Sequence, residues 1–514
     1  MLEVQRRIAA LRESPGNGRP LYEQVANEMA QAIRAGELRP GERLPSVRQL
    51  ATDLGLSVST VMSVYTRLAE GGLVNGEAGR GTFVSETPSA GAVPAAPAPR
   101  PAAEPAAAVR AGSAWRRQVL AQTEARLKHG FPSARDLMRG GPDPALLPLS
   151  VIKRAYRDVS SRLTAHDLEY PATLGTEPEL SDALLKRLAG DGIEAEADDI
   201  LIGGSTQQFL ALLAMLLGRR APGERVLVGV EEPGYQTAMD TLEFHGLGLV
   251  PMRLDESGVT AEGLRGALDA GVSAVLFTPR AQSPTGCGWS AERRQALADA
   301  LIPHPDVWII EDDQFAEAAT ARPGSLYGEA RLRERVVHLR SFSKSVAPDL
   351  RLSAAVVRQP IRHPLTMAKS FADGWTSRTS QRVLAAALTD PRIDDLLAEA
   401  RTEYALRRAA VRDAVRRAGA DRGLGLSVPA LDTDGLHVWV TLPDGCDADR
   451  VVEAAAHRGF LLAAGQPFFL SPGDQRHLRI NAGALPAEHA ERLATAVCDA
   501  ATSVLGQPTA LLTP

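Results

Sequence analysis

Residues 336–357 read VVHLRSFSKSVAPDLRLSAAVV, two apolar runs separated by a short polar loop. The spacing predicts two strands, 336–339 and 352–357, and the loop between them carries Lys344 and Arg351. Lysine is rare in this chain, which has five lysines beside 52 arginines. A primary amine can form a Schiff base and a guanidinium cannot, so Lys344 is a candidate for covalent chemistry; an ordinary surface lysine is the alternative.

Further apolar runs alternate with amphipathic helical stretches on the N-terminal side of this segment. The alternation predicts a mostly parallel α/β sheet with helices on both faces. After about residue 370, long helical runs followed by shorter strands predict a separate α+β subdomain. The expected strands are 200–202, 226–230, 249–252, 274–277, 307–310, 336–339 and 352–357 in the sheet, and 437–441, 460–463 and 478–480 in the subdomain.

A proline- and alanine-rich stretch divides the chain into a short and a long part. Residues 86–112 contain six prolines and little that could form a core, which is typical of an extended linker. The expected organisation is an N-terminal extension (1–19), a small domain (20–85), the linker (86–112) and a large domain (113–514) with subdomains at about 135–370 and 371–505.

Composition limits the classes of protein that this chain can represent. The net charge is −5, and the longest apolar run, 209–217, is too short for a membrane helix. Charged residues stand where a secretory signal would be apolar, and three scattered cysteines make neither a disulfide framework nor a cysteine-based metal site. We therefore expect a cytoplasmic protein without a metal.

The small domain shows three short helical patterns and then a hairpin. Apolar residues recur at helical spacing over 21–33, 47–54 and 57–68, and the glycines at 79 and 81 mark a turn between two short strands. A helix–turn–helix places its second helix in the DNA major groove, and a following wing can meet phosphates. The candidate DNA contacts are Arg48, Ser57, Ser59, Thr60 and Arg80.

Capping serines and solvated arginines are the alternative interpretation of those residues. Ten basic and nine acidic residues in 1–85 give a net charge of +1, which is weak for a phosphate-binding surface. However, PLYEQVANEMAQAIRAGELRPGERLPSVRQLATDLGLSVSTVMSVYTRLAEGGLVNGEAGRGTFV resembles the GntR-type winged helix–turn–helix over its whole length. The resemblance implies that the five candidates face an operator in double-stranded DNA.

The large domain carries, in order along the chain, the parts that a pyridoxal phosphate (PLP) site requires. Such a site needs a lysine amine, an acid for the pyridine nitrogen, an aromatic ring over the cofactor, and donors for its phosphate at a helix N-terminus. Lys344 supplies the amine, Asp312 ends an apolar strand, Tyr235 follows another, and a Gly-Gly-Ser-Thr turn opens a helix at 203–206. Each feature alone is common in loops and cores; their order along one chain indicates the site.

The motifs RGGPDPALLP, EYPATLG, GGSTQQ, EEPGYQ, TPRAQSPTG, IIEDD, SFSKSVAPDLRLS, GLHVWV and LRINAG resemble the fold-type I aminotransferases. A winged helix joined to this fold resembles the MocR/GabR-type regulators, and a head-to-tail, domain-swapped homodimer is implied. The resemblance makes Lys344 the Schiff-base lysine, Asp312 the partner of the pyridine nitrogen and Tyr235 the stacking ring. It implies a phosphate site of Ser205, Thr206, Ser341, Ser343 and Arg351, with Tyr170 from the partner subunit, and a ligand-carboxylate site at Arg479.

Two departures from the aminotransferase pattern bear on catalysis. Ser283 stands where the enzymes have an asparagine for the cofactor's phenolic oxygen, and Gln314 and Phe315 stand where a tyrosine is expected. Loss of one hydrogen bond to a charged group changes its energy by about 1.5–3 kcal/mol, enough to affect proton transfer at Lys344. We therefore expect a transcription regulator that senses PLP, an amino acid or an amine. The alternatives are an active aminotransferase with a regulatory N-terminal domain and a scaffold that has lost the cofactor.

Overall fold

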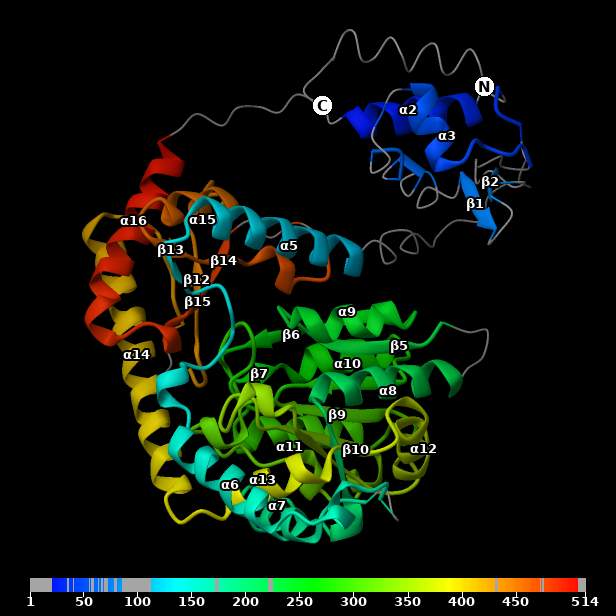
Figure 1. Cartoon of the computed structure of the whole chain (residues 1–514). Coiled ribbons are helices and arrows are strands. Elements are labelled where there is room, and N and C mark those ends of the chain that lie inside the picture. The colour runs from blue at the N-terminus through cyan, green and yellow to red at the C-terminus, as the bar shows by residue number, and fades with distance from the viewer. Residues whose placement is uncertain are drawn as a thin grey trace. The chain divides into compact units, whose positions relative to one another are not determined.

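The computed structural model divides into two compact units, residues 1–102 and 103–514, each of which is described by itself (Figure 1). The described residues are 21–34, 37–39, 41–54, 56, 60–62, 64–65, 68, 73–77, 81–85, 112–171, 175–220, 225–429, 433–471, 473 and 476–506.

The first unit contains two of the three predicted helices and the predicted hairpin, whereas the third predicted helix, 57–68, lies partly outside the described residues. Helices α2 (Leu21–Arg34) and α3 (Val47–Leu54) are followed by the antiparallel strands β1 (Val74–Glu77) and β2 (Gly81–Val84). The amide of Gln49 donates to the side-chain oxygen of Ser46 at 3.2 Å, which caps the start of α3. The apolar stripes of the helices close a small core, which includes Val25, Met29, Leu50, Val61 and Val64.

An eight-stranded sheet forms the centre of the second unit, in the order β4-β11-β10-β9-β8-β5-β6-β7. Neighbours from β10 through β9, β8 and β5 to β6 are parallel, whereas β11 is antiparallel to both of its neighbours and β7 is antiparallel to β6. The strands are β4 (Ile200–Gly203), β5 (Leu227–Glu232), β6 (Gly248–Asp255), β7 (Gly258–Val259), β8 (Ala274–Phe277), β9 (Trp308–Asp313), β10 (Val336–Ser341) and β11 (Ser353–Val357).

Helices cover both faces of this sheet, as the alternating pattern predicts. Helices α8, α9 and α12 share one apolar core with one face, and α6, α7, α10, α11 and α13 share another core with the opposite face. The helices are α6 (Leu149–Arg162), α7 (Pro178–Gly190), α8 (Thr206–Arg220), α9 (Gln236–Phe244), α10 (Ala261–Asp269), α11 (Ala291–Leu301), α12 (Arg362–Ala372) and α13 (Arg378–Leu388).

The C-terminal subdomain contains a segment from far earlier in the chain. Its antiparallel sheet has the order β12-β15-β14, and a separate pair joins β13 to β3 in parallel. Leu127 and Leu137 lie in its core, whereas Arg116, closer to the linker, is buried against Asp240 and Glu243 of α9 in the large subdomain. The elements are α5 (Gly112–Gly130), β3 (Arg135–Asp136), α14 (Ile393–Asp421), β12 (His437–Thr441), α15 (Ala448–Ala456), β13 (Phe460–Leu461), β14 (Ala463–Ala464), β15 (His477–Asn481) and α16 (Ala490–Leu505).

Helix α14 connects the two subdomains along one side of the unit (Figure 1). Ile393 and Leu397, near its start, belong to a core of the large sheet, whereas Val411 and Val415 belong to the core of the C-terminal subdomain. One continuous helix therefore sets the distance between the two subdomains.

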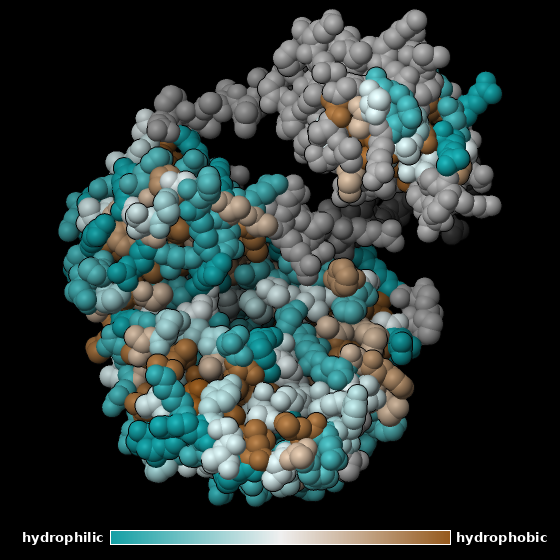
Figure 2. Space-filling model, in the orientation of Figure 1, coloured by the Kyte–Doolittle hydropathy of each residue, from teal (hydrophilic) through white to brown (hydrophobic). Residues whose placement is uncertain are grey.

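The surface of the second unit is mostly hydrophilic with separate apolar patches, as Figure 2 shows for one face. Within the described ranges, every helix is too short or too polar to span a membrane. The large apolar side chains that are exposed in this unit are Leu149, Tyr156, Leu168, Tyr170, Phe244, Met367, Phe371, Trp375, Leu406 and Leu505.

A buried group of charges lies beneath the carboxyl ends of the parallel strands. Arg280 donates to Asp313 at 2.9 and 2.5 Å and to Asp191 at 3.0 Å. Arg340 donates to Asp191 at 2.7 Å and to Glu317 at 2.6 Å. Both arginines are nearly inaccessible and supply counter-charge to all three carboxylates, and Arg322 also lies 3.4 Å from Asp191.

We predict that Arg280→Met lowers the free energy of unfolding by about 3–5 kcal/mol, because it leaves the buried carboxylate of Asp313 without its arginine. Urea unfolding followed by tryptophan fluorescence measures the change. The control is Arg331→Met, which removes an exposed ion pair with Glu329 and should leave the midpoint unchanged. Equal midpoints for the two variants would contradict the structural role of Arg280.

Candidate functional site

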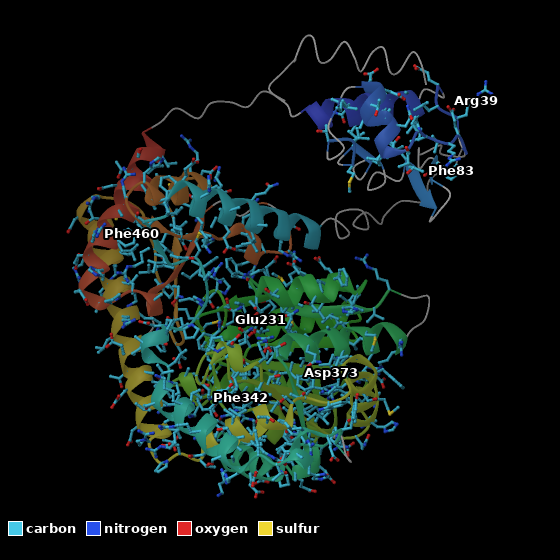
Figure 3. The ribbon with its side chains drawn as sticks, in the orientation of Figure 1. Arg39, Phe83, Glu231, Phe342, Asp373 and Phe460 are labelled. Atoms are coloured by element: carbon cyan, nitrogen blue, oxygen red, sulfur yellow. The ribbon has the colours of Figure 1, made fainter. Side chains whose placement is uncertain are left out.

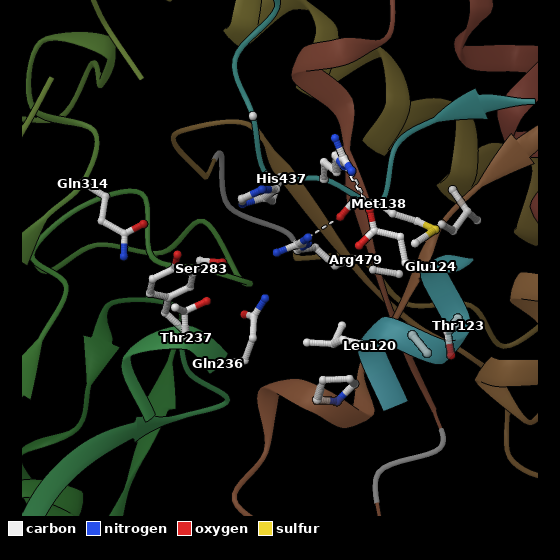
Figure 4. A pocket seen from close by; sticks show the side chains of 18 of the residues that line it. Leu120, Thr123, Glu124, Met138, Gln236, Thr237, Ser283, Gln314, His437 and Arg479 are labelled. Atoms are coloured by element: carbon white, nitrogen blue, oxygen red, sulfur yellow. Dashed lines mark hydrogen bonds and ion pairs between the residues drawn. The ribbon is translucent and has the colours of Figure 1, made fainter. Parts of the chain in front are cut away.

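A cavity of about 420 Å³ lies between the large and the C-terminal subdomains, and Figure 4 shows its lining. Gln236, Thr237 and Ser283 stand on one side of the view, and His437 and Arg479 face them from the C-terminal subdomain. The lining includes Leu120, Thr123, Glu124, Met138, Gly140, Tyr235, Gln236, Thr237, Ser283, Gln314, Phe315, Lys344, His437, Asp449, Leu462, Pro467 and Arg479.

Lys344 lies three residues beyond the end of β10, and its side chain lines the cavity. Its amine donates a hydrogen bond to the carbonyl oxygen of Gly140. Burial and the nearby charge of Arg479 lower the pKa of Lys344 to about 8, although Asp312 acts in the opposite direction. A substantial fraction of the amine is therefore neutral near physiological pH, which is the state that attacks a carbonyl group.

Asp312 and Asp313 end β9 side by side, but they serve different partners. Arg280 outweighs the effect of burial and holds the pKa of Asp313 well below its usual range. Burial raises the pKa of Asp312 to about 6, against hydrogen bonds from Gln314 and Thr206. The Oδ2 atom of Asp312 accepts from Gln314 at 2.8 Å, whereas its Oδ1 atom is buried without a partner. This oxygen can therefore accept a hydrogen bond from a donor that a ligand supplies.

Tyr235 precedes the first residue of α9 and is largely buried. It lines the main cavity together with Lys344, and it also lines a small recess together with Asp312. Burial raises the pKa of the Tyr235 hydroxyl. The ring, the acid and the amine that the sequence singled out are thus brought together at one end of the sheet.

The side-chain amide of Gln282 fixes the loop at 281–286 by hydrogen bonds. Its Nε2 atom donates to Glu231 at 3.1 Å and to the carbonyl of Pro233 at 2.8 Å, and its Oε1 atom accepts from the amide and the hydroxyl of Thr285. Glu231 lies well inside the large subdomain (Figure 3), and burial raises its pKa to about 7. These bonds place Ser283 against the cavity, where it is only 5% exposed.

The residues expected around a phosphate gather where β4 and β10 end and β11 begins. In the sheet register, Gly203 pairs with Ser353, and Ser353 pairs with Ser341. A Cβ on Gly204 would lie 3.8 Å from the carbonyl oxygen of Arg351, and Arg351 itself has the left-handed φ of 53°. This edge carries Ser205, Thr206, Ser341, Ser343 and Arg351, none of which lines the 420 Å³ cavity.

Arg479 enters the cavity from β15 and is 5% exposed. Its Nη2 atom donates to the carbonyl of Met138, and its guanidinium lies 4.7 Å from the centre of the Phe468 ring. Burial lowers the pKa of Arg479 to about 10. Its Nε atom is buried without a partner, so the side chain keeps a donor for a ligand.

The expectation for Tyr170 requires a second chain, and in the single chain Tyr170 stands apart from the cavity. It is 85% exposed and contacts only the edge of Trp375 among the aromatic rings, at 5.3 Å between ring centres, in the described part of the chain.

The DNA candidates fall mostly outside the described residues. Ser57, Ser59, Arg80 and the side chain of Arg48 are among those that the structure leaves undescribed. Thr60 is half-buried at the start of the helical residues 60–62.

Three parts of the cavity lie outside the residues to which the sequence assigns a role. His437 is buried beside Arg479; its place in an alternating strand was the available signal. Leu120, Thr123 and Glu124 come from α5, whose apolar residues form no clear stripe and so gave no signal. Gly140 belongs to the motif RGGPDPALLP, but its contact with Lys344, 204 residues away in the chain, follows only from the fold.

Known proteins resemble this chain in its N-terminal segment and over most of its length. Residues 21–84 match the family of bacterial regulatory proteins described as gntR. Over 456 residues the chain is 29% identical to the vitamin B6 salvage pathway transcriptional repressor PtsJ of Salmonella typhimurium, covering 87% of this chain and 92% of PtsJ. Over 342 residues it is 31% identical to the HTH-type transcriptional regulator YjiR of Escherichia coli K12, and the match covers 64% of this chain and 68% of YjiR.

Among solved structures, the kynurenine aminotransferase of Pyrococcus horikoshii matches with a TM-score of 0.67. The match covers 76% of this chain and 95% of the enzyme at 24% identity, which shows a shared fold. The predicted fold classes, a winged helix–turn–helix and a fold-type I aminotransferase domain with a C-terminal α+β subdomain, are confirmed.

We predict that the amine of Lys344 reacts with acetic anhydride at a rate that rises with pH and is half-maximal near pH 8. The neutral amine is the reactive form, and burial lowers its pKa to about 8. Mass spectrometry of labelled peptides measures the rate at each lysine separately. A rate at Lys344 that is still rising steeply above pH 10 would contradict the prediction.

Proposed function

The chain belongs to the MocR-type GntR transcriptional regulators, DNA-binding proteins with an aminotransferase-like domain, and from this premise we propose that its DNA binding responds to PLP held at Lys344. The observation that carries the proposal is the pairing of a reactive amine with an unsatisfied acid. The amine is that of Lys344, and the acid is the unpartnered Oδ1 atom of Asp312.

The described residues offer partners for the aldehyde, the ring, the pyridine nitrogen and the phosphate of the cofactor. Lys344 would hold the aldehyde carbon, Tyr235 would lie against the ring, and Asp312 Oδ1 would accept a hydrogen bond from the protonated pyridine nitrogen. The strand ends would hold the phosphate through Ser205, Thr206, Ser341, Ser343 and Arg351, and Tyr170 of the partner subunit would join them. At the start of α8, backbone N–H groups and the helix dipole favour an anion.

The bound cofactor would supply a carbonyl group that exchanges between amines and a ring that withdraws electrons. The chain's own groups set how far that chemistry proceeds. Gln314 occupies Oδ2 of Asp312, and the hydroxyl of Ser283 lines the cavity where the enzymes have an amide. With these two replacements, we propose that the cavity binds and senses ligands, and that any transamination is slow.

We propose an amino acid or an amine as the second ligand, with Arg479 as the group that meets its carboxylate. The relative from Salmonella typhimurium is named for the vitamin B6 salvage pathway, which supports a link to the cofactor. Exposed apolar side chains such as Tyr170, Phe371 and Trp375 support a homodimer, in which the winged helices would be paired on DNA. Contact with the chromosome would place the protein in the cytoplasm.

We predict specific binding to DNA upstream of the protein's own gene, with an affinity that changes when PLP is added. The measurement is an equilibrium titration at fixed, near-physiological salt, with a scrambled duplex for comparison. Lys344→Ala should lose the absorbance of a lysine-bound cofactor, lose any borohydride-reducible adduct, and bind DNA equally with and without PLP.

Lys153→Ala is the control for that variant, because it removes an exposed lysine on α6. It should keep the absorbance and the response to PLP. A reducible adduct in Lys344→Ala would disprove the assignment of the lysine, and equal binding to both duplexes by the wild type would disprove operator recognition.

We predict that Arg48→Ala weakens binding to most DNA sequences alike. Loss of one phosphate contact should reduce the slope of log affinity against log salt by about one. Titrations at three salt concentrations measure the slope. An unchanged slope and affinity would show that Arg48 does not face the DNA.

A further inference from the structure

His437 occupies a position that the proposed chemistry at Lys344 does not use. It begins β12, where it pairs with Asn481 of β15, and Trp439 two residues later pairs with Arg479. Alternate residues of a strand point to the same face, so His437 and Arg479 are diagonal neighbours on one face of the subdomain's sheet. Figure 4 shows both side chains in the cavity, beside the segment that carries Met138.

The imidazole of His437 has no internal partner for one of its nitrogen atoms. His437 is 3% exposed, and its Nε2 atom makes no hydrogen bond within the described chain. Phe315 meets the ring edge-on, at 6.4 Å between ring centres. A buried polar atom that faces a cavity without a partner indicates a group that a ligand supplies.

The charges around His437 select the kind of ligand. Burial and the positive charges of Arg479, Lys344 and Arg408 lower the pKa of His437, so the ring is neutral. A neutral imidazole carries one N–H, and an anion next to Nε2 favours the tautomer with the proton there. Arg479 also has an unpaired Nε atom on the same face. Two unpaired nitrogens in a positive field form a receptor for a carboxylate.

Gly140 lies between this receptor and the amine of Lys344. Its carbonyl oxygen accepts from Lys344, while a Cβ on the same residue would lie 3.1 Å from Nε2 of His437 and 3.8 Å from Nη1 of Arg479. One glycine therefore touches the amine site on one side and the receptor on the other. A ligand that reaches both needs its amino and carboxylate groups within a few bonds of each other.

We propose that His437, together with Arg479, binds the ligand's carboxylate, so that the cavity selects amino acids over amines that lack a carboxylate. The proposal rests on the proposed function, because the amine end of the ligand is recognised at the cofactor. Apolar side chains of Leu120, Met138 and Leu462 line the rest of the cavity and suit an aliphatic side chain.

The test compares two probes that differ only in the carboxylate, L-norvaline and butan-1-amine. Each is titrated into full-length protein loaded with PLP, and the change in cofactor absorbance gives an apparent dissociation constant. Pentanoate, which has the carboxylate and no amine, is then added as a competitor of L-norvaline.

The variants separate the donor from the shape of the ring. His437→Phe removes the N–H and should raise the apparent dissociation constant of L-norvaline by about tenfold or more, which is the loss expected for a hydrogen bond to a charged group. The same variant should change the apparent dissociation constant of butan-1-amine by less than about twofold. His437→Gln places an amide N–H near the same point and should recover most of the affinity. The control His477→Phe changes a histidine of β15 that stacks on Trp439, at 5.0 Å between ring centres, and lines a different cavity. It should behave as the wild type does.

The expected result is also that pentanoate competes in the wild type and fails to compete in His437→Phe. The proposal would be overturned if His437→Phe affected both probes equally or affected neither. It would also be overturned if the wild type bound butan-1-amine more tightly than L-norvaline. Failure of the proposed function is visible earlier, as a wild type that takes up no PLP before any probe is added.

Discussion

Arg280 holds Asp313 through two nitrogen atoms in the interior of the large subdomain, and this contact decides what its neighbour Asp312 can do. Successive residues of β9 point to opposite faces of the sheet, so a single ion pair fixes one acid and leaves the other facing the cavity region. Without the guanidinium, two buried carboxylates would stand side by side, and each would raise the pKa of the other. The pair therefore creates one structural acid and one acid that is free to take a partner.

Backbone carbonyls of one short segment join the two halves of the site. The carbonyl of Met138 accepts from Arg479, and the carbonyl of Gly140 accepts from Lys344. The side-chain amide of Asn481 donates to the carbonyls of Arg139 and Gly141. The cationic groups of both subdomains are thus already hydrogen-bonded to the segment that passes between them. A ligand that binds both cations must compete with these carbonyls or rearrange them, which makes affinity depend on how easily the segment moves.

The sequence was most informative where function follows strand order. Lys344, Asp312 and Tyr235 come from different strands, and parallel strands bring their carboxyl ends to one edge, so linear order translates into proximity. His437 was given no role, because neither its place in an alternating strand nor the motif GLHVWV distinguishes a ligand-binding histidine from a core residue. The contribution of α5 could not be predicted, because nothing in residues 112–130 indicates that they pack against both subdomains.

Helix α5 is the first described element after the proline-rich stretch, and its position affects where the protein can be divided. Arg116 is fully buried between Asp240 and Glu243 of α9, the helix that starts beside Tyr235. Further along α5, Glu124 accepts from Arg139 at 2.7 Å and lines the cavity. A shortened protein that began at β3 would retain the whole central sheet and Lys344, yet it would lack one wall of its cavity. The shortest fragment that keeps the complete cavity therefore starts before Arg116, at the end of the linker.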